Sequence, residues 1–126
     1  MTVPATWLRD IAAAGGAYWP LTIFNAEPFI RIITYVGVDY TAATFEGGIR
    51  AAFEDSSELL QPFGFATELS DGNTLVTVSI AEEDVITLRG GVDLGAIETL
   101  FHNIKCTPPG GDKLTHFAGE LFLHGA

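Results

Sequence analysis

The sequence predicts an all-β protein: an antiparallel, immunoglobulin-like β-sandwich of about seven strands. Three observations lead to this expectation. Short runs of β-branched and aromatic residues recur along the chain, turn residues separate them, and neither alternating strand–helix units nor a repeat of fixed period is present. A chain of 126 residues is long enough to bury a two-layer core. We expect two parts: an N-terminal helix and aromatic arm over residues 1–20, and a sandwich domain over residues 21–126.

The arm differs from the rest of the chain. Thr6 can cap a short helix over residues 7–14, which Gly15 and Gly16 would end. Two interpretations stay open: the helix lies across one end of its own sandwich, or the arm inserts into a neighbouring subunit. Exposed tryptophans are typical interface anchors and favour the second. The candidate interface residues are Trp7, Leu8, Ile11, Tyr18 and Trp19.

Five strand-like runs and one hairpin follow the arm. The run over residues 74–80 alternates most clearly, with Val76, Val78 and Ile80 on one side. The tetrapeptide before it, residues 70–73 (SDGN), is a strong turn signal. The predicted strands cover residues 21–24, 29–36, 48–54, 65–69 and 74–80, and the hairpin covers residues 97–126.

The terminal hairpin turns at residues 108–112 (PPGGD), where two prolines remove backbone donors and two glycines allow positive φ. Gly119, inside its second strand, indicates a bulge or the close approach of another backbone. Residues 81–88 (AEEDVITL) are the one internal helical turn that we expect, because acidic residues come first and apolar ones follow.

Composition limits the function. Charged residues make up 17% of the chain and the mean hydropathy is +0.30, so we expect another chain to cover part of the apolar surface. The net charge of −10 argues against binding to nucleic acid or to an anionic membrane surface. The sequence holds neither an apolar span long enough for membrane insertion nor a secretory signal, so we expect synthesis in a cytoplasm without ordinary export.

Catalytic chemistry is not expected. Residues 82–84 (EED) suit a helix start better than a metal site, and the single cysteine, Cys106, reads as a packed side chain. His102, His116 and His124 all fall in the terminal hairpin, where His102 and His116 could face each other. Two histidines still lack the third ligand that catalytic zinc requires. We therefore predict no enzyme activity, no catalytic residue, no cofactor and no bound metal.

Three segments carry a resemblance to a known family: FIRIITYVGVDYTAATFEGGIRAAFED, DGNTLVTVSIAEEDVITL and FHNIKCTPPGGDKLTHFAGELFLHG. Together they resemble the β-sandwich at the N-terminus of phage baseplate upper proteins, the domain that fixes receptor-binding parts to the tail. Gly119 fits the glycine of that family's closing strand. The chain departs from the family at residues 101–104, where tyrosine and aspartate are more common.

The resemblance implies a non-enzymatic virion structural protein, a tail, baseplate or tail-fibre adaptor that assembles with other virion proteins and with copies of itself. Its location would be the virion. Two alternatives stay open. One is a capsid decoration protein. The other is a carbohydrate-binding module for a host glycan, with Tyr35, Tyr40 and Phe63 as platforms, although packing explains these rings more simply.

Overall fold

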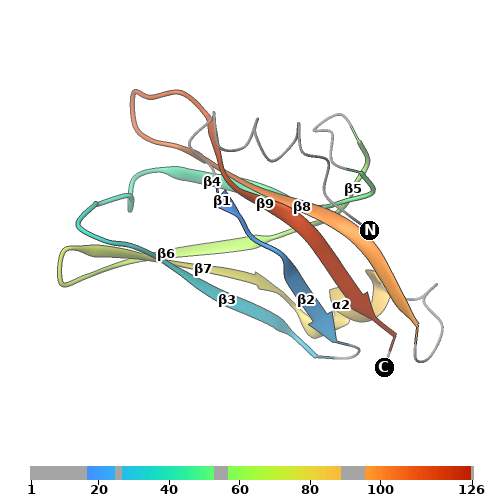
Figure 1. Cartoon of the computed structure of the whole chain (residues 1–126). Coiled ribbons are helices and arrows are strands. Elements are labelled where there is room, and N and C mark those ends of the chain that lie inside the picture. Colours follow the sequence, from blue (N-terminus) through green and yellow to red (C-terminus); the bar gives the residue numbers. More distant parts are fainter. Residues whose placement is uncertain (1–16, 25–26, 53–56, 89–95, 126) are drawn as a thin grey trace.

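The computed structural model describes residues 17–24, 27–52, 57–88 and 96–125, which form two packed β-sheets (Figure 1). The large sheet has the order β1-β9-β8-β4-β5, with β2 also pairing with β9, and the small sheet has the order β3-β7-β6. The elements are β1 (Ala17–Tyr18), β2 (Leu21–Phe24), β3 (Phe29–Tyr35), β4 (Thr44–Arg50), β5 (Leu59–Pro62), β6 (Gly64–Ser70), β7 (Asn73–Ile80), α2 (Glu82–Leu88), β8 (Ile97–Thr107) and β9 (Leu114–His124). The prediction of an all-β, two-layer sandwich is confirmed.

Strand pairing is antiparallel within the described residues except at the N-terminal side of the large sheet. There β1 and β2 run parallel to β9, a pairing that the antiparallel prediction did not include. Parallel neighbours need a long connection between them, and almost the whole domain separates these strands in sequence. The first and last strands of the sandwich therefore lie side by side.

Most predicted elements appear close to their expected bounds, and α2 is the predicted helical turn. The clearest shift is at β4, which spans Thr44–Arg50 where we predicted residues 48–54. The predicted strand began at Gly48, although glycine is a poor strand former, and left Gly47 out. Here both glycines lie inside the strand. The four-residue strand β5 was not predicted; it ends on Pro62, which is tolerated at a strand end.

The two hairpin turns behave as their sequences predict. Between β6 and β7, Asp71 has φ 50° and Gly72 has φ 78°, as a two-residue type I′ turn requires. Between β8 and β9, Gly110 has φ 70°, and the amide of Gly111 donates to the carbonyl oxygen of Pro108 at 3.0 Å. Both turns therefore fix the pairing of their strands.

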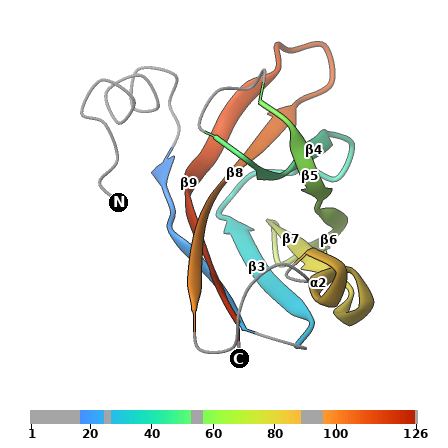
Figure 2. The ribbon, with the colours of Figure 1, turned by 90° about the vertical axis from the view of Figure 1, so that its right-hand side faces the viewer.

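The core fills the space between the two sheets, which Figure 2 shows from the side. Strand β7 alternates as predicted, with Val76 and Val78 at 0% exposure and Ile80 at 3%. Val85 brings α2 into the same core. Burial of each such side chain stabilises the fold by about 1.5–3 kcal/mol. The completely buried aliphatic residues opposite them in the large sheet are Ile49, Ile104, Leu121 and Leu123.

Gly119 marks a close backbone approach, one of the two outcomes that we predicted for it. A Cβ atom built there would lie 2.5 Å from the carbonyl oxygen of Trp19. The bulge in this hairpin lies elsewhere: Ile104 pairs with Phe117 and Lys105 with Thr115, which leaves His116 as the extra residue. Glycine at 119 is thus what allows the arm to cross β9 tightly.

Candidate interaction sites

The first candidate surface follows β3, an edge strand of the small sheet. β3 pairs with β7 along one side only. Ile30 and Ile32 are 54% and 62% exposed, and Val36, directly after the strand, is 78% exposed. We call Ile30, Ile32 and Val36 the β3 strip. An exposed aliphatic edge strand is a template for pairing with another chain, so this strip matches the apolar surface that composition led us to expect.

The outer face beside the β3 strip is uncharged in its two central rows. Strand pairing aligns Ile30 with Ser79 and Gly64, and Ile32 with Thr77 and Ala66. These four partners carry no ionisable side chain. A second acidic chain can therefore meet these two rows without facing a carboxylate; the nearest one on this face is Glu68, in the row of Thr34.

Of the predicted interface residues, Trp7, Leu8 and Ile11 lie outside the described residues. The structure places the other two, Tyr18 and Trp19, at the edge of the large sheet. The side chain of Tyr18 is 44% exposed, and its hydroxyl donates a hydrogen bond to the carboxylate of Glu120. Burial and this neighbouring carboxylate raise the pKa of Tyr18 to about 12.

Trp19 belongs to the fold itself. Its amide donates to the carbonyl oxygen of Ala118 at 2.9 Å, and its ring meets that of Phe117 edge-on at 5.4 Å between centroids. It lines a cavity of about 330 Å³ between β1 and β3, together with Tyr18, Ile32 and Ile33. The cavity joins the two described members of the predicted interface to the β3 strip.

His102 lies on β8 beside Trp19, and a hydrogen bond between the two connects the segment around Trp19 to β8. It is 2% exposed, and its Nε2 donates to the carbonyl oxygen of Trp19 at 2.5 Å. Its Nδ1 atom is buried and has no partner among the described residues. Burial disfavours the charged imidazolium and lowers the pKa of His102 to about 4. The ring is therefore neutral in the folded protein at neutral pH.

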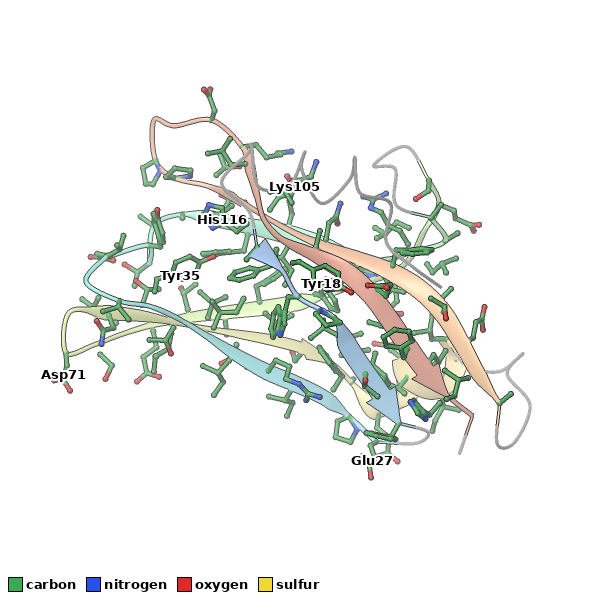
Figure 3. All side chains as sticks on the ribbon, viewed as in Figure 1. Tyr18, Glu27, Tyr35, Asp71, Lys105 and His116 are labelled. Carbon is green, nitrogen blue, oxygen red and sulfur yellow. The ribbon has the colours of Figure 1, made fainter. Side chains whose placement is uncertain are left out.

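His102 and His116 do not face each other. His102 pairs across the hairpin with Gly119, whereas His116 sits on the bulge, where its Nδ1 is 2.8 Å from the hydroxyl of Tyr35 (Figure 3). Burial lowers the pKa of His116. Within the described part of the chain, no three histidine, cysteine or acidic residues lie close enough together to hold a metal ion.

The aromatic rings considered as sugar platforms are packed, as the simpler interpretation predicted. Tyr35 and Tyr40 meet edge-on with centroids 5.0 Å apart, and Phe63 is 6% exposed. Cys106 is also packed, at 0% exposure, and burial raises the pKa of its thiol. Neither the Tyr35–Tyr40 pair nor the thiol presents an open reactive or binding surface.

The second candidate site is a cavity of about 380 Å³ at the edge of β4. Its walls combine three phenylalanine rings with three cationic side chains. Such a mixture of apolar wall and few convergent polar groups is typical of ligand sites. The residues that carry the argument below are Phe45, Phe63, Phe65, Arg50, Lys105 and Lys113.

Comparisons with known proteins identify no relative of this chain. No family model matches the chain, and no curated protein matches its sequence. The likeness to phage baseplate upper proteins therefore stays a prediction. Among the described residues, no helix has the length and apolar character needed to cross a membrane.

Proposed function

We propose that this chain is a non-enzymatic assembly subunit that binds copies of itself and other chains through the β3 strip. The observation that carries the proposal is the exposure of three aliphatic side chains on and directly after β3, an edge strand that pairs along one side only. Ile30, Ile32 and Val36 are 54%, 62% and 78% exposed. Edge strands of this kind are normally shortened, charged or covered, because they otherwise pair with other chains.

The more specific role that we propose is a virion structural protein, an adaptor in a phage tail, baseplate or tail fibre. Its support is the resemblance of residues 29–125 to the sandwich of baseplate upper proteins. Electron microscopy of purified phage particles that carry an epitope-tagged copy tests this role. Tail labelling supports the adaptor, head labelling supports the alternative of a capsid decoration protein, and unlabelled particles contradict both.

We further propose that the sandwich is immunoglobulin-like. Its sheet orders β3-β7-β6 and β9-β8-β4-β5 correspond to strands B-E-D and G-F-C-C′ of that fold. β1 and β2 would then be a first strand that runs along the last strand instead of along B. This arrangement accounts for the open edge at β3, because the position beside strand B is where strand A of a constant-type domain lies. The inter-sheet disulfide of antibody domains has no counterpart, since the chain has one cysteine.

Light scattering of the purified chain tests the assembly role. We expect the wild type to be an oligomer and Ile32→Lys to be a monomer, because a lysine on the β3 strip must lose its hydration when a partner covers it. Ile86→Lys is the matched control: Ile86 is also an exposed isoleucine, at 45%, but it lies on α2. A monomeric wild type, or an Ile32→Lys variant as oligomeric as the control, contradicts self-assembly through the strip.

The arm requires a separate test. A truncation should end at residue 16, because Trp19 is hydrogen-bonded to Ala118 and His102 and its removal would disturb the sheet. Trp7→Ala tests the arm without touching those contacts. If the truncated chain and Trp7→Ala assemble as the wild type does, the β3 strip acts without the arm.

A further inference from the structure

The cavity at β4 lies where the chain leaves one sheet for the other. β5 ends at Pro62 in the large sheet, β6 begins at Gly64 in the small sheet, and Phe63 turns the corner between them. The amide of Phe63 donates to the carbonyl oxygen of Gly47 at 3.0 Å. Beyond Gly47, toward the start of β4, no described strand pairs with β4 on this side.

The backbone of Phe45 lies at the cavity, on the side of β4 where no described strand pairs with it. In an antiparallel strand, the N–H and C=O groups of every second residue point to the same side. The carbonyl of Gly47 points away from β8, toward Phe63, so the backbone of Phe45, two residues earlier, points the same way. No described strand pairs with Phe45 on this side of β4, so the edge is open to an added strand.

The cavity concentrates positive charge in an acidic protein. Arg50, Lys105 and Lys113 line it, which is three of the six cationic residues of the whole chain. Among the described residues of its wall, Glu46 is the one acid, whereas the chain as a whole has sixteen. The described side chains of the wall therefore carry more positive than negative charge, the opposite of the chain as a whole, and this balance attracts carboxylates.

These cations lie on one side of β4 and an aromatic wall lies on the other. Lys105 pairs with Glu46 on the face of the large sheet that is turned away from the small sheet (Figure 3). The rings of Phe45 and Phe63 both contact Phe65, with centroids 6.1 and 6.2 Å apart, on the inner side. A strand added along this edge alternates its side chains between the two environments.

Gly47 fits β4 closely against β8: it has φ 144°, a conformation that favours glycine, and a Cβ atom there would overlap the backbone of Asn103. The charged side chains at the cavity leave it accessible to an added strand. Lys113 forms an ion pair with Glu46, but the two side chains are 53% and 47% exposed. Exposed ion pairs contribute about 0–1 kcal/mol, so an incoming carboxylate exchanges with Glu46 at little cost.

We propose that this cavity, the β4 pocket, binds an extended acidic segment of a partner chain by strand addition. Its backbone pairs with Phe45, its carboxylates meet Lys105, Lys113 and Arg50, and its intervening apolar side chains contact the phenylalanine rings. The sequence recognised thus alternates acidic and apolar residues. This inference concerns a different edge from the β3 strip, and it stands whether or not the chain belongs to a virion.

The test titrates the ¹⁵N-labelled full chain with a synthetic peptide and follows amide chemical shifts. The probe is acetylated and amidated Asp-Leu-Asp-Phe-Asp-Leu. Two modified peptides separate the contribution of charge from that of backbone hydrogen bonds. The first has Asn in place of each Asp and so lacks the negative charges. The second is N-methylated at the central residues and so lacks backbone donors. We expect the probe to shift the amides of Phe45, Glu46 and Gly47, and both modified peptides to bind at least about tenfold more weakly.

Protein variants supply the matched controls. Lys113→Glu should weaken the probe at least about tenfold, whereas Arg31→Glu, which reverses a cation outside the pocket, should not weaken it. Lys113→Gln should weaken binding of the probe by a smaller factor. It is the second variant to measure if Lys113→Glu does not fold. Raising the salt concentration should weaken the probe as well, because screening reduces attraction between exposed charges.

Three results overturn the proposal. One is the absence of shifts at Phe45–Gly47 at millimolar probe. Another is equal binding of the Asp and Asn peptides, or an equal loss in Lys113→Glu and Arg31→Glu. The third is unchanged binding of the N-methylated peptide, which would show that the pocket takes a carboxylate without strand addition.

Discussion

The outer faces of the two sheets have opposite characters. On the large sheet, Phe101, Asn103 and Glu120 alternate with core residues and so point outward, yet they are 6%, 6% and 4% exposed. On the small sheet, Ile30 and Ile32 also point outward, but they are 54% and 62% exposed. On the large sheet even the polar outward side chains of Asn103 and Glu120 are buried within the single chain, whereas on the small sheet two outward isoleucines are open. Since folding normally does the reverse, the open apolar face is the one we expect a partner to cover.

The largest expected effect on stability is at the contact between Trp19 and β9 in the large sheet. Gly119→Val should lower the free energy of unfolding by about 3 kcal/mol or more, because a side chain there collides with the backbone of Trp19. Urea unfolding measures the effect. Gly64→Ala is the control on the open side: its new Cβ would lie 3.2 Å from the movable hydroxyl of Ser79, and we expect a change within about 0.5 kcal/mol. Equal losses of unfolding free energy in Gly119→Val and Gly64→Ala would show that the backbone of Trp19 does not restrict position 119.

The next largest effect is a pH dependence of stability that His102 confers. Its pKa is about 4 in the fold against 6.5 ordinarily, so below pH 6.5 the unfolded chain binds a proton that the folded chain does not. Stability must therefore fall as the pH falls, by about 2 kcal/mol between pH 7 and pH 5. Urea unfolding at both pH values measures this slope.

His102→Gln should make the slope shallower by about that amount. Burial also lowers the pKa of His116, so His116→Gln separates its contribution, which has the same sign. A slope that His102→Gln leaves unchanged would show that His102 is not the group that titrates.

A smaller effect is expected for the bond between the arm and Glu120. Tyr18→Phe removes the hydroxyl that donates to this buried carboxylate and should cost about 1–2 kcal/mol. Tyr40→Phe is the control, because the hydroxyl of Tyr40 makes no hydrogen bond among the described residues. Thermal or urea unfolding of both variants measures the difference, and equal losses would show that the Tyr18–Glu120 bond contributes little.

The smallest effect on stability is expected for a substitution on the exposed outer face of the small sheet. Ile32→Lys should change the free energy of unfolding of the monomer by no more than about 0.5 kcal/mol, since the side chain is 62% exposed. Unfolding at low protein concentration measures this. A large loss would mean that Ile32 supports the fold, and that its effect on assembly is indirect.

Local signals were sufficient to predict part of this structure. The turn at residues 70–73 and the alternation of Val76, Val78 and Ile80 specify β6 and β7 from neighbouring residues alone. Trp19 is different: it was expected as an interface residue, and its packing against Phe117 depends on a parallel pairing of distant strands. The segment over residues 29–36 was predicted as a strand, but its position at an edge depends on which strands flank it.

The β4 pocket was missed for the same reason. Arg50, Lys105 and Lys113 come from three separate segments, and the pairing of β4 with β8 brings the first two to neighbouring strands. The sequence did hold one indication of this site. The chain has only six cationic residues, so a place where two of them lie close together stands out from the rest of the surface. Without the strand pairing, that indication does not say which of them meet.

Hydrogen exchange at increasing protein concentration tests the central claim most directly, because it reads both sheets in one experiment. The account predicts that exchange of the β3 amides slows as the protein assembles, while the amides of β8 and β9 are already slow in the dilute monomer and do not change. Slowing confined to β8, β9 or β5, with β3 unaffected, would contradict assembly through the β3 strip.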